Sequence, residues 1–390
     1  MTFVGGAISL SFRGFFPRRS VAFEDIAPYA DAEVPQVLAR LGRDDRLIAA
    51  AAKFVSPSLS RWFGPVFRPL VGARIRRELA GIDSVRAFQT LLARGFAWMV
   101  DTTTDGLTVT GVEGIDPEMR YLFVSNHRDI ALDSAFVNYA LYRAGHPTTR
   151  LAFGDNLLAT GFAADVMRLN KGFVVKRSAK AGKAGYAAML ETSQYIRASL
   201  DAGESVWIAQ RDGRAKDGWD KTDAALVKMF ALAFRKETED LATVVSRLGV
   251  LPVAISYELD PCDVAKAREV SAKARGEVYE KAPGEDLRSV IRGVTGAKGR
   301  VHLNFGTPLT GPFADAEAIA TAIDRQIVAG YRLFPTHYWA AARAGVPNLP
   351  VVAACPALEA HLAACPEPDR DALIAQYANP VKHARALDLI

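Results

Sequence analysis

The hydrophobic positions of the chain fall into short apolar runs separated by stretches with helical periodicity. Short runs of β-prone residues predict buried strands, and apolar residues that recur at helical spacing predict helices. Because strands alternate with helices, the pattern indicates an α/β fold with a mostly parallel mixed sheet flanked by helices. The predicted strands cover residues 107–112, 121–124, 151–154, 172–177, 205–209, 250–256 and 299–306. The predicted helices cover residues 22–55, 84–99, 134–144, 156–169, 183–200 and 221–235.

These elements divide the chain into three regions. Residues 101–312 hold the predicted strands and form the α/β domain, which carries a charged, mostly helical insertion at about residues 262–297. Residues 1–100 form an N-terminal helical region. Residues 313–390 form a C-terminal helical region that prolines interrupt.

One N-terminal segment, residues 56–77, alternates aromatic residues with arginines and prolines. In one interpretation it contacts a membrane, with Trp62, Phe63 and Phe67 among the headgroups and the arginines on lipid phosphates. In the other it is a kinked segment that packs on the α/β domain and keeps its arginines in water. The prolines break the apolar stripe, so the pattern favours neither interpretation.

The amino-acid composition indicates a folded protein and bears on the kind of partner that it binds. Half of the 390 residues are hydrophobic, which allows a sizeable core and argues against general disorder. The net charge of +5 fits anionic partners such as phosphates or an anionic membrane. Nucleic acid is disfavoured because most basic residues are well mixed with acidic ones.

The cellular location is inferred from what the sequence lacks. Three cysteines without a C-x-x-C spacing favour a reducing, cytoplasmic compartment. No uncharged apolar run reaches the roughly 20 residues that span a bilayer. In residues 1–20 the charges follow the apolar part, which is the wrong order for a secretory signal. We therefore expect a cytoplasmic protein.

The most informative stretch is residues 121–133, YLFVSNHRDIALD. An apolar strand ends within it, and Asn126 can cap a following helix. His127 then lies at a strand-to-helix junction, where α/β folds usually place their chemistry. Two carboxylates follow, Asp129 and Asp133. A lone His near an Asp is usually structural, so a catalytic role depends on the rest of the chain.

Two later strands also end in charged residues. Lys176 and Arg177 close one strand, and the sequence DGRAK follows another, with Arg214 and Lys216 as its cations. A His–Asp pair beside such cations suits a base that acts on a phosphorylated substrate, because Arg binds phosphate bidentately and Lys adds a point charge. Gly213 would let the backbone turn tightly near the ligand.

These motifs resemble those of the glycerolipid acyltransferase family, which acylates glycerol-3-phosphate and lysophosphatidate. The family carries an Asn-His motif with a following Asp, a Gly–strand–Arg block, a block such as E-G-G-R-S-R, an apolar strand with a Pro, and a late F-G-x-P. Similar features stand in this order at residues 126–133, 172–177, 208–216, 250–255 and 305–308. The resemblance covers roughly residues 105–310 and implies that the α/β domain is an acyltransferase domain.

The first motif departs from the family pattern, because His127 and Asp133 are one residue further apart than usual. Six residues turn through about 600° on an ideal helix, so the two side chains would not share a face. Either His127 sits in the loop before the helix or Asp129 serves instead. We favour Asp133, because the family's Asp follows the apolar residues of the first turn.

The third block departs as well. Arg211 falls where the family has a Glu, and the nearest substitutes are Asp212 and Gln210. We favour Asp212, which keeps a carboxylate beside the glycine. The family's Glu shapes the substrate site, so this departure bears on substrate choice more than on reaction class.

The resemblance implies a reaction and its partners. A fatty acyl group would move from a thioester, on coenzyme A or acyl carrier protein, to a hydroxyl of lysophosphatidate in phospholipid biosynthesis. His127 would be the general base, since histidine titrates nearest neutrality, and Asp133 would fix its tautomer. No Ser stands in a G-x-S-x-G elbow, which favours direct transfer without an acyl-enzyme. No metal or other cofactor is required.

The same resemblance gives the binding residues. Arg177 and Arg214, with Lys176 and Lys216, would hold the phosphate of the acceptor. Backbone amides at the helix start after Asn126 would stabilise the developing oxyanion. We expect the protein to work on the surface of the cytoplasmic membrane, as a peripheral protein.

Other functions remain open at this point. Within the family, glycerol-3-phosphate acyltransferase is the nearest alternative, because the third block has its G-R-x-K form, and an ornithine-lipid or other lysolipid acceptor is another. A metal-dependent phosphohydrolase could use His127, Asp129 and Asp133 but would need further ligands. A non-catalytic lipid-binding protein could keep the basic groove without turnover.

Overall fold

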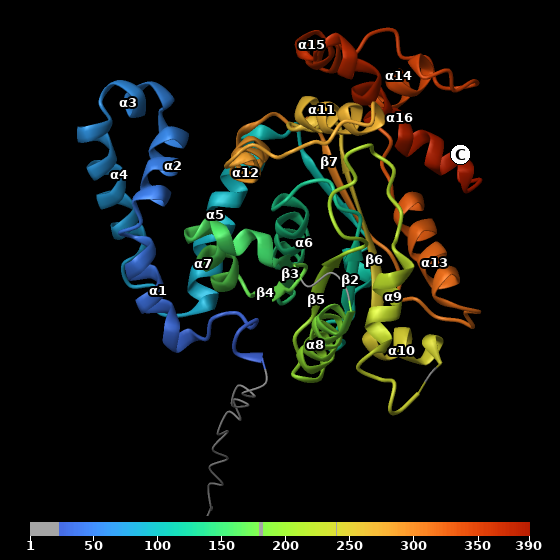
Figure 1. Cartoon of the computed structure of the whole chain (residues 1–390), viewed down its shortest axis with the longest axis horizontal. Helices are drawn as coiled ribbons and strands as arrows, with labels where there is room; N and C mark the ends of the chain where they lie inside the picture. Colours follow the sequence, from blue (N-terminus) through green and yellow to red (C-terminus); the bar gives the residue numbers. More distant parts are fainter. Residues whose placement is uncertain (1–22, 179–181, 239) are drawn as a thin grey trace, which may run out of the picture.

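A single seven-stranded sheet forms the centre of the protein in the computed structural model, which describes residues 23–178, 182–238 and 240–390 (Figure 1). The strand order is β1-β7-β6-β2-β5-β3-β4. β7 pairs antiparallel with β6 and parallel with β1, and the other pairs are parallel. The predicted α/β fold with a mostly parallel mixed sheet is therefore confirmed. The strands are β1 (Leu107–Thr110), β2 (Leu122–Ser125), β3 (Arg150–Gly154), β4 (Gly172–Val175), β5 (Val206–Ala209), β6 (Val250–Tyr257) and β7 (Val301–Phe305).

Each predicted strand is present, although β7 is three residues shorter than predicted, β1 and β4 are two residues shorter, and β5 is one residue shorter. β1 ends at Thr110, before a 3-10 turn over Val112–Gly114. β4 ends at Val175, because Lys176 leaves the sheet edge to pair with Asp25. Side-chain partners outside the sheet therefore set this second boundary.

Helices cover both faces of the sheet (Figure 1). α8, α9, α10 and α13 pack on one face, and α5 and α6 pack on the other. The central strands are buried from both sides, which explains why they are nearly continuous apolar runs. These helices are α5 (Val85–Thr103), α6 (Leu132–Arg143), α8 (Gly182–Asp201), α9 (Ala224–Ala231), α10 (Leu241–Leu248) and α13 (Ala316–Ala329).

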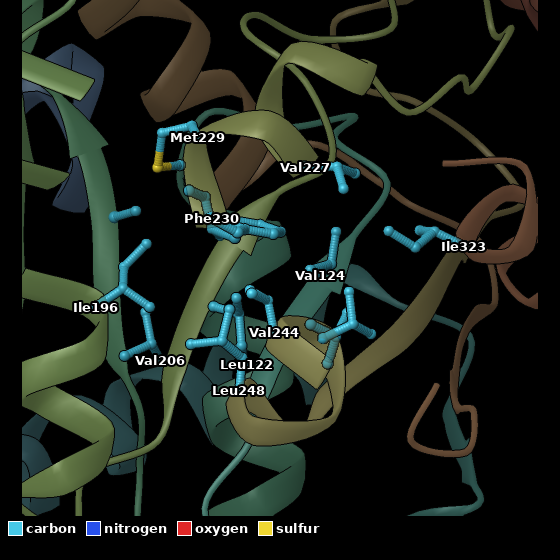
Figure 2. Close-up of a cluster of buried hydrophobic side chains, with 14 of the residues drawn as sticks. Leu122, Val124, Ile196, Val206, Val227, Met229, Phe230, Val244, Leu248 and Ile323 are labelled. Atoms are coloured by element: carbon cyan, nitrogen blue, oxygen red, sulfur yellow. The ribbon is translucent and has the colours of Figure 1, made fainter. Parts of the chain in front are cut away.

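Figure 2 shows the core on the first of these faces, where Leu122 and Val206 meet Phe230 of α9. Successive side chains of a strand point to opposite faces. Phe123 and Trp207, which follow Leu122 and Val206, therefore belong to the core under α5 and α6. This alternation brings Trp207 to the face where the α6 helix begins.

The N-terminal region, where residues 22–55 are predicted to be helical, is a series of helices. Asp44 ends the first part and caps the next helix, because its carboxylate accepts hydrogen bonds from the amides of Arg46 and Leu47. Residues 1–22, including the segment predicted not to be a secretory signal, lie outside the described residues. The helices are α1 (Val34–Leu41), α2 (Asp45–Val55), α3 (Pro57–Trp62), α4 (Gly64–Leu79) and, packed against α1, α7 (Phe162–Leu169).

In Figure 1, α2, α3 and α4 stand apart from the sheet, at the left of the molecule. Within the described part of the chain, no helix is both long enough and apolar enough to cross a bilayer.

The insertion and the C-terminal region pack together. α11 shares a buried core with α14 and α16, and α16 also reaches the loop after β5. There, Nδ2 of Asn379 donates to the carbonyl oxygen of Asp217 over 2.7 Å. The rings of Trp219 and His383 stack with their centroids 4.5 Å apart. The helices are α11 (Asp263–Ala274), α12 (Glu285–Thr295), α14 (Pro335–Arg343), α15 (Pro356–Ala364) and α16 (Arg370–Ala386).

Candidate active site

The candidate site lies at the carboxyl ends of β2 and β5, where the chain leaves these two strands toward opposite faces of the sheet. β2 and β5 are neighbours, but the chain leaves β2 for α6 on one face and β5 for α9 on the other. Adjacent strands connected in this way leave a crevice beyond their carboxyl ends, the usual binding place of α/β sheets. The loops after both strands meet there, since the amide of Ala215 donates to the carbonyl oxygen of His127 over 2.7 Å.

His127 and Asp133 are in contact at this crevice. Nδ1 of His127 lies 2.9 Å from Oδ2 of Asp133, and the Asp133 side chain is fully buried. A carboxylate can only accept here, so the neutral imidazole carries its proton on Nδ1 and leaves Nε2 as the acceptor. The imidazole side chain is 12% exposed.

The loop before α6 explains how residues six apart can pair. His127 precedes the helix, whereas Asp133 lies in its first turn, so ideal helical geometry does not apply. Asp129 takes another role, because its Oδ1 accepts hydrogen bonds of 2.9 Å from the amides of Ala131 and Leu132. Burial and the nearby Asp133 carboxylate raise the pKa of Asp129. Asp133, rather than Asp129, is thus the residue that contacts His127.

Four backbone amides of the loop before α6 donate hydrogen bonds to the carboxylates of Asp129 and Asp133. Those of Arg128 and Asp129 donate to Oδ2 of Asp133 over 2.6 and 2.8 Å. Those of Ala131 and Leu132 donate to Asp129. The prediction that the start of this helix would offer its amides to an oxyanion is therefore wrong for these four groups.

Two aromatic residues that the sequence analysis did not single out complete the surroundings of the pair. The hydroxyl of Tyr257, the last residue of β6, donates to Oδ1 of Asp133 over 2.7 Å. Trp207 of β5 meets the His127 ring edge to face, with centroids 6.2 Å apart, and its Nε1 donates to Oγ of Ser125. Both residues look like core positions in the sequence, so only their placement in space reveals them.

A buried ion pair joins the two loops of the crevice. Nε and Nη2 of Arg128 donate to Oδ2 of Asp220 over 3.0 and 2.6 Å, and Nη2 also donates to the carbonyl oxygen of Gly218. The same Asp220 oxygen accepts from Asn126 and from the hydroxyl of Tyr331. Burial alone would lower the pKa of Arg128, but the Asp220 carboxylate outweighs it and raises this pKa above its usual value. The pair fixes the loop after β5 against the His127 loop.

Asn126 does not cap a helix, contrary to the prediction. Its side chain instead bridges to β6, where Oδ1 accepts from the Ile255 amide over 2.8 Å and Nδ2 donates to the Ile255 carbonyl oxygen over 3.0 Å. Asn126 therefore fixes the end of β2 beside β6, directly before His127.

The predicted binding residues Arg177, Asp212 and Gly213 lie at the loops after β4 and β5. Nη1 of Arg177 lies 2.8 Å from Oδ1 of Asp212, whose side chain is 70% exposed. Gly213 has a φ of +74°, a left-handed conformation that favours glycine and lets the loop turn next to Asp212. Arg177 is thus held by a carboxylate that remains open to solvent.

The four predicted cations differ in their partners. Among the residues that the structure describes, no carboxylate pairs with Arg214, which is half-buried next to Ala215. Lys176 lies 2.5 Å from Asp25 and 2.9 Å from Glu191, at the edge of the sheet. Lys216 pairs with Glu269 of α11, and burial lowers its pKa although Glu269 opposes this.

The insertion packs against the loop that holds His127, a contact that no feature of the sequence predicts. Nζ of Lys266 on α11 donates to the carbonyl oxygen of Arg128 over 2.6 Å. Gly293 of α12 lies so close that a Cβ there would be 2.5 Å from Oδ2 of Asp129. These contacts join residues far apart in the sequence, and no local pattern predicts them.

A metal centre was the alternative to acid–base chemistry at this place. In the described ranges, no group of three or more His, Cys, Asp and Glu side chains could hold a metal ion. The arrangement at His127 offers a buried carboxylate and an oriented imidazole, and Arg214 precedes the residue that contacts the His127 carbonyl oxygen. An imidazole held in this way can take a proton from a hydroxyl.

Comparisons with known proteins bear on the reaction class. Residues 106–256, which include the His127 segment and the loop after β5, match the model of a family described as Acyltransferase. A solved structure, that of the 1-acyl-sn-glycerophosphate (LPA) acyltransferase PlsC from Thermotoga maritima, is similar at 15% identity and a TM-score of 0.39, covering 72% of this chain and 92% of that one. No curated protein matches the chain. The family match identifies residues 106–256 as an acyltransferase domain, so the chain carries the domain of an acyltransferase enzyme.

Proposed function

We propose that the enzyme transfers a fatty acyl group from a thioester donor to a hydroxyl of lysophosphatidate, in phospholipid biosynthesis. The observation that carries the proposal is the 2.9 Å contact between Nδ1 of His127 and Oδ2 of Asp133 within the region that matches the acyltransferase family. A hydroxyl is a poor nucleophile at neutral pH and needs a base when it attacks a thioester. His127 is oriented for that task.

The proposed transfer is a direct displacement. Nε2 of His127 takes the proton of the acceptor hydroxyl while its oxygen bonds to the thioester carbonyl carbon. The C–S bond then breaks, and the thiolate of coenzyme A or acyl carrier protein takes the proton from the imidazolium, which returns His127 to its neutral form. Asp133 stabilises the imidazolium while it exists.

We further propose that Arg214 and Arg177 bind the phosphate of the acceptor. Arg214 is supported by its lack of a carboxylate partner in the described part of the chain and by its position one residue before the contact with His127. Arg177 is supported by its accessible partner, Asp212, which the phosphate could replace. Lys176 and Lys216 are poorer candidates than the sequence indicated, because carboxylates already neutralise both.

Replacing Arg214 with alanine is expected to raise the KM for lysophosphatidate by about 10- to 100-fold, because a hydrogen bond to a charged group contributes about 1.5–3 kcal/mol. The assay measures transfer from long-chain acyl-CoA by the purified protein. Arg143→Ala, at the far end of α6, is the control and should leave KM unchanged. An unchanged KM in Arg214→Ala would exclude Arg214 from phosphate binding.

The same assay separates the acceptors. Transfer to glycerol-3-phosphate but not to lysophosphatidate would favour the glycerol-3-phosphate acyltransferase alternative. If neither acceptor is acylated, the assay is repeated with acyl carrier protein as the donor and then with other lysolipid acceptors. Lipid binding without any transfer would instead support the non-catalytic alternative.

We also propose that the enzyme contacts the surface of the cytoplasmic membrane through α3 and α4. Trp62, Phe63 and Leu70 are 73%, 62% and 63% exposed, which is unusual for such large apolar side chains. The Arg61 guanidinium lies over the Trp62 ring, 5.5 Å from its centroid, so a cation and an apolar surface are presented together. A lipid headgroup layer accommodates both.

Replacing Trp62 and Phe63 together with serine is expected to weaken sedimentation with vesicles of anionic phospholipid at least tenfold, since each buried aromatic contributes about 1.5–3 kcal/mol. Tyr142→Ser removes an exposed aromatic from α6 and serves as the matched control. Equal binding by both variants and the wild type would exclude this surface.

A further inference from the structure

Tyr257 makes one of the hydrogen bonds that hold the proposed catalytic pair. It ends β6, one residue beyond the region that matches the family model, and its hydroxyl reaches a carboxylate 124 residues away in sequence. The bond from the Tyr257 hydroxyl to Oδ1 of Asp133 measures 2.7 Å. The Tyr257 ring meets Phe136 of α6 edge to face, with centroids 5.9 Å apart, so the phenol has a fixed position.

The two oxygens of Asp133 are supported very differently. Oδ2 accepts from two backbone amides and faces Nδ1 of His127. For Oδ1, Tyr257 is the one donor found among the described residues. The phenol therefore holds the second oxygen of the carboxylate in place and takes up part of the charge that the imidazolium would otherwise meet.

The charges around the phenol keep it in the donor form. Burial, and then the carboxylates of Asp133 and Asp129, raise the pKa of Tyr257 well above its usual value. Asp260 acts in the same direction, while the Lys266 ammonium pairs with Asp260 and lies near Asp129. The hydroxyl consequently keeps its proton and donates to Asp133 throughout the neutral pH range.

We propose that Tyr257 is a positioning residue of the transfer reaction, which sets the orientation of the Asp133 carboxylate against His127 and moderates its charge. The inference rests on the proposed function of His127 as the base. It adds a residue to the site that acts through Asp133 and does not touch the substrate.

The test is Tyr257→Phe, which removes the hydroxyl and keeps the ring in place. We expect kcat to fall about tenfold, the loss expected for one hydrogen bond to a charged group, with KM within about twofold of the wild type. Without its donor, Asp133 carries more charge and stabilises the imidazolium more strongly. The acid limb of the kcat/KM profile should therefore move to higher pH by about half a unit or more.

Tyr377→Phe is the matched control. Its hydroxyl donates to Oδ2 of Asp263 over 2.7 Å, and the same oxygen lies 2.6 Å from Nδ1 of His361, so the variant breaks the same kind of bond at a carboxylate that does not contact His127. We expect both variants to unfold at a lower temperature than the wild type. Tyr377→Phe should nevertheless keep the wild-type kcat and pH profile. Its behaviour separates a kinetic effect from a loss of stability.

The outcomes distinguish this inference from the proposed function. If His127→Ala is inactive while Tyr257→Phe keeps the wild-type kcat and acid limb, Tyr257 has no positioning role and the inference fails alone. If His127→Ala keeps full activity, the proposed function fails first. A kcat reduced equally in Tyr257→Phe and Tyr377→Phe, with no shift of the acid limb, would mean that both tyrosines act only through stability.

Discussion

Replacing His127 with alanine is expected to reduce the rate of acyl transfer by about 10²- to 10⁴-fold, the usual contribution of a positioned general base. The imidazole is held by a buried carboxylate and is 12% exposed, so its removal deletes the proposed proton acceptor and little else. KM for the acceptor should change by less than about threefold, because the proposed phosphate contacts lie on Arg177 and Arg214.

His361→Ala provides the control for this experiment. It also removes an imidazole whose Nδ1 faces a buried aspartate, in this case Asp263, but it lies on α15. Initial rates with lysophosphatidate and long-chain acyl-CoA should be normal in His361→Ala and nearly absent in His127→Ala, with both proteins folded by circular dichroism. Normal turnover by a folded His127→Ala protein would refute the proposed mechanism.

The largest effect on stability is expected for Arg128→Met, which should lower the free energy of unfolding by about 3–5 kcal/mol. The substitution leaves the Asp220 carboxylate buried, with a side chain only 1% exposed, without its cation. A buried charge that loses its partner is costly because little water can replace it. The midpoint of urea unfolding, monitored by tryptophan fluorescence, measures the change.

Arg300→Met tests whether burial is the cause. Arg300 also donates through Nε and Nη2 to one carboxylate, Glu258, but its side chain is 45% exposed. An exposed pair contributes at most about 1 kcal/mol, so this variant should be close to the wild type. Equal losses in the two variants would show that the Arg128–Asp220 pair has no special role in holding the crevice together.

The sheet could be predicted from the sequence because burial on both faces gives each strand an apolar run. β2 and β6, at the centre, were recognised within one residue at each end. The errors fall where polar side chains decide the boundary. Asp44 divides the predicted N-terminal helix by capping α2, and Lys176 leaves β4 early to reach Asp25.

Only the part of the candidate site that lies within one local segment could be predicted from the sequence. The motif around His127 identified the segment, but the choice between Asp129 and Asp133 depends on the path of a loop, which no periodicity describes. Asp220 and Tyr257 contact this segment from 92 and 124 residues away. Lys176 and Lys216 pair with carboxylates from other elements, and no local pattern predicts these contacts.

Because α16 contacts the loop after β5, the position at which the chain can be truncated is restricted. The region matching the family model ends at residue 256, yet Asp217 and Trp219 of that loop rest on Asn379 and His383. A fragment cut at the family boundary would expose these contacts and leave the loop that carries Arg214 without its backing. Anyone who transplants this catalytic unit into a chimeric enzyme must therefore carry the C-terminal helices with it.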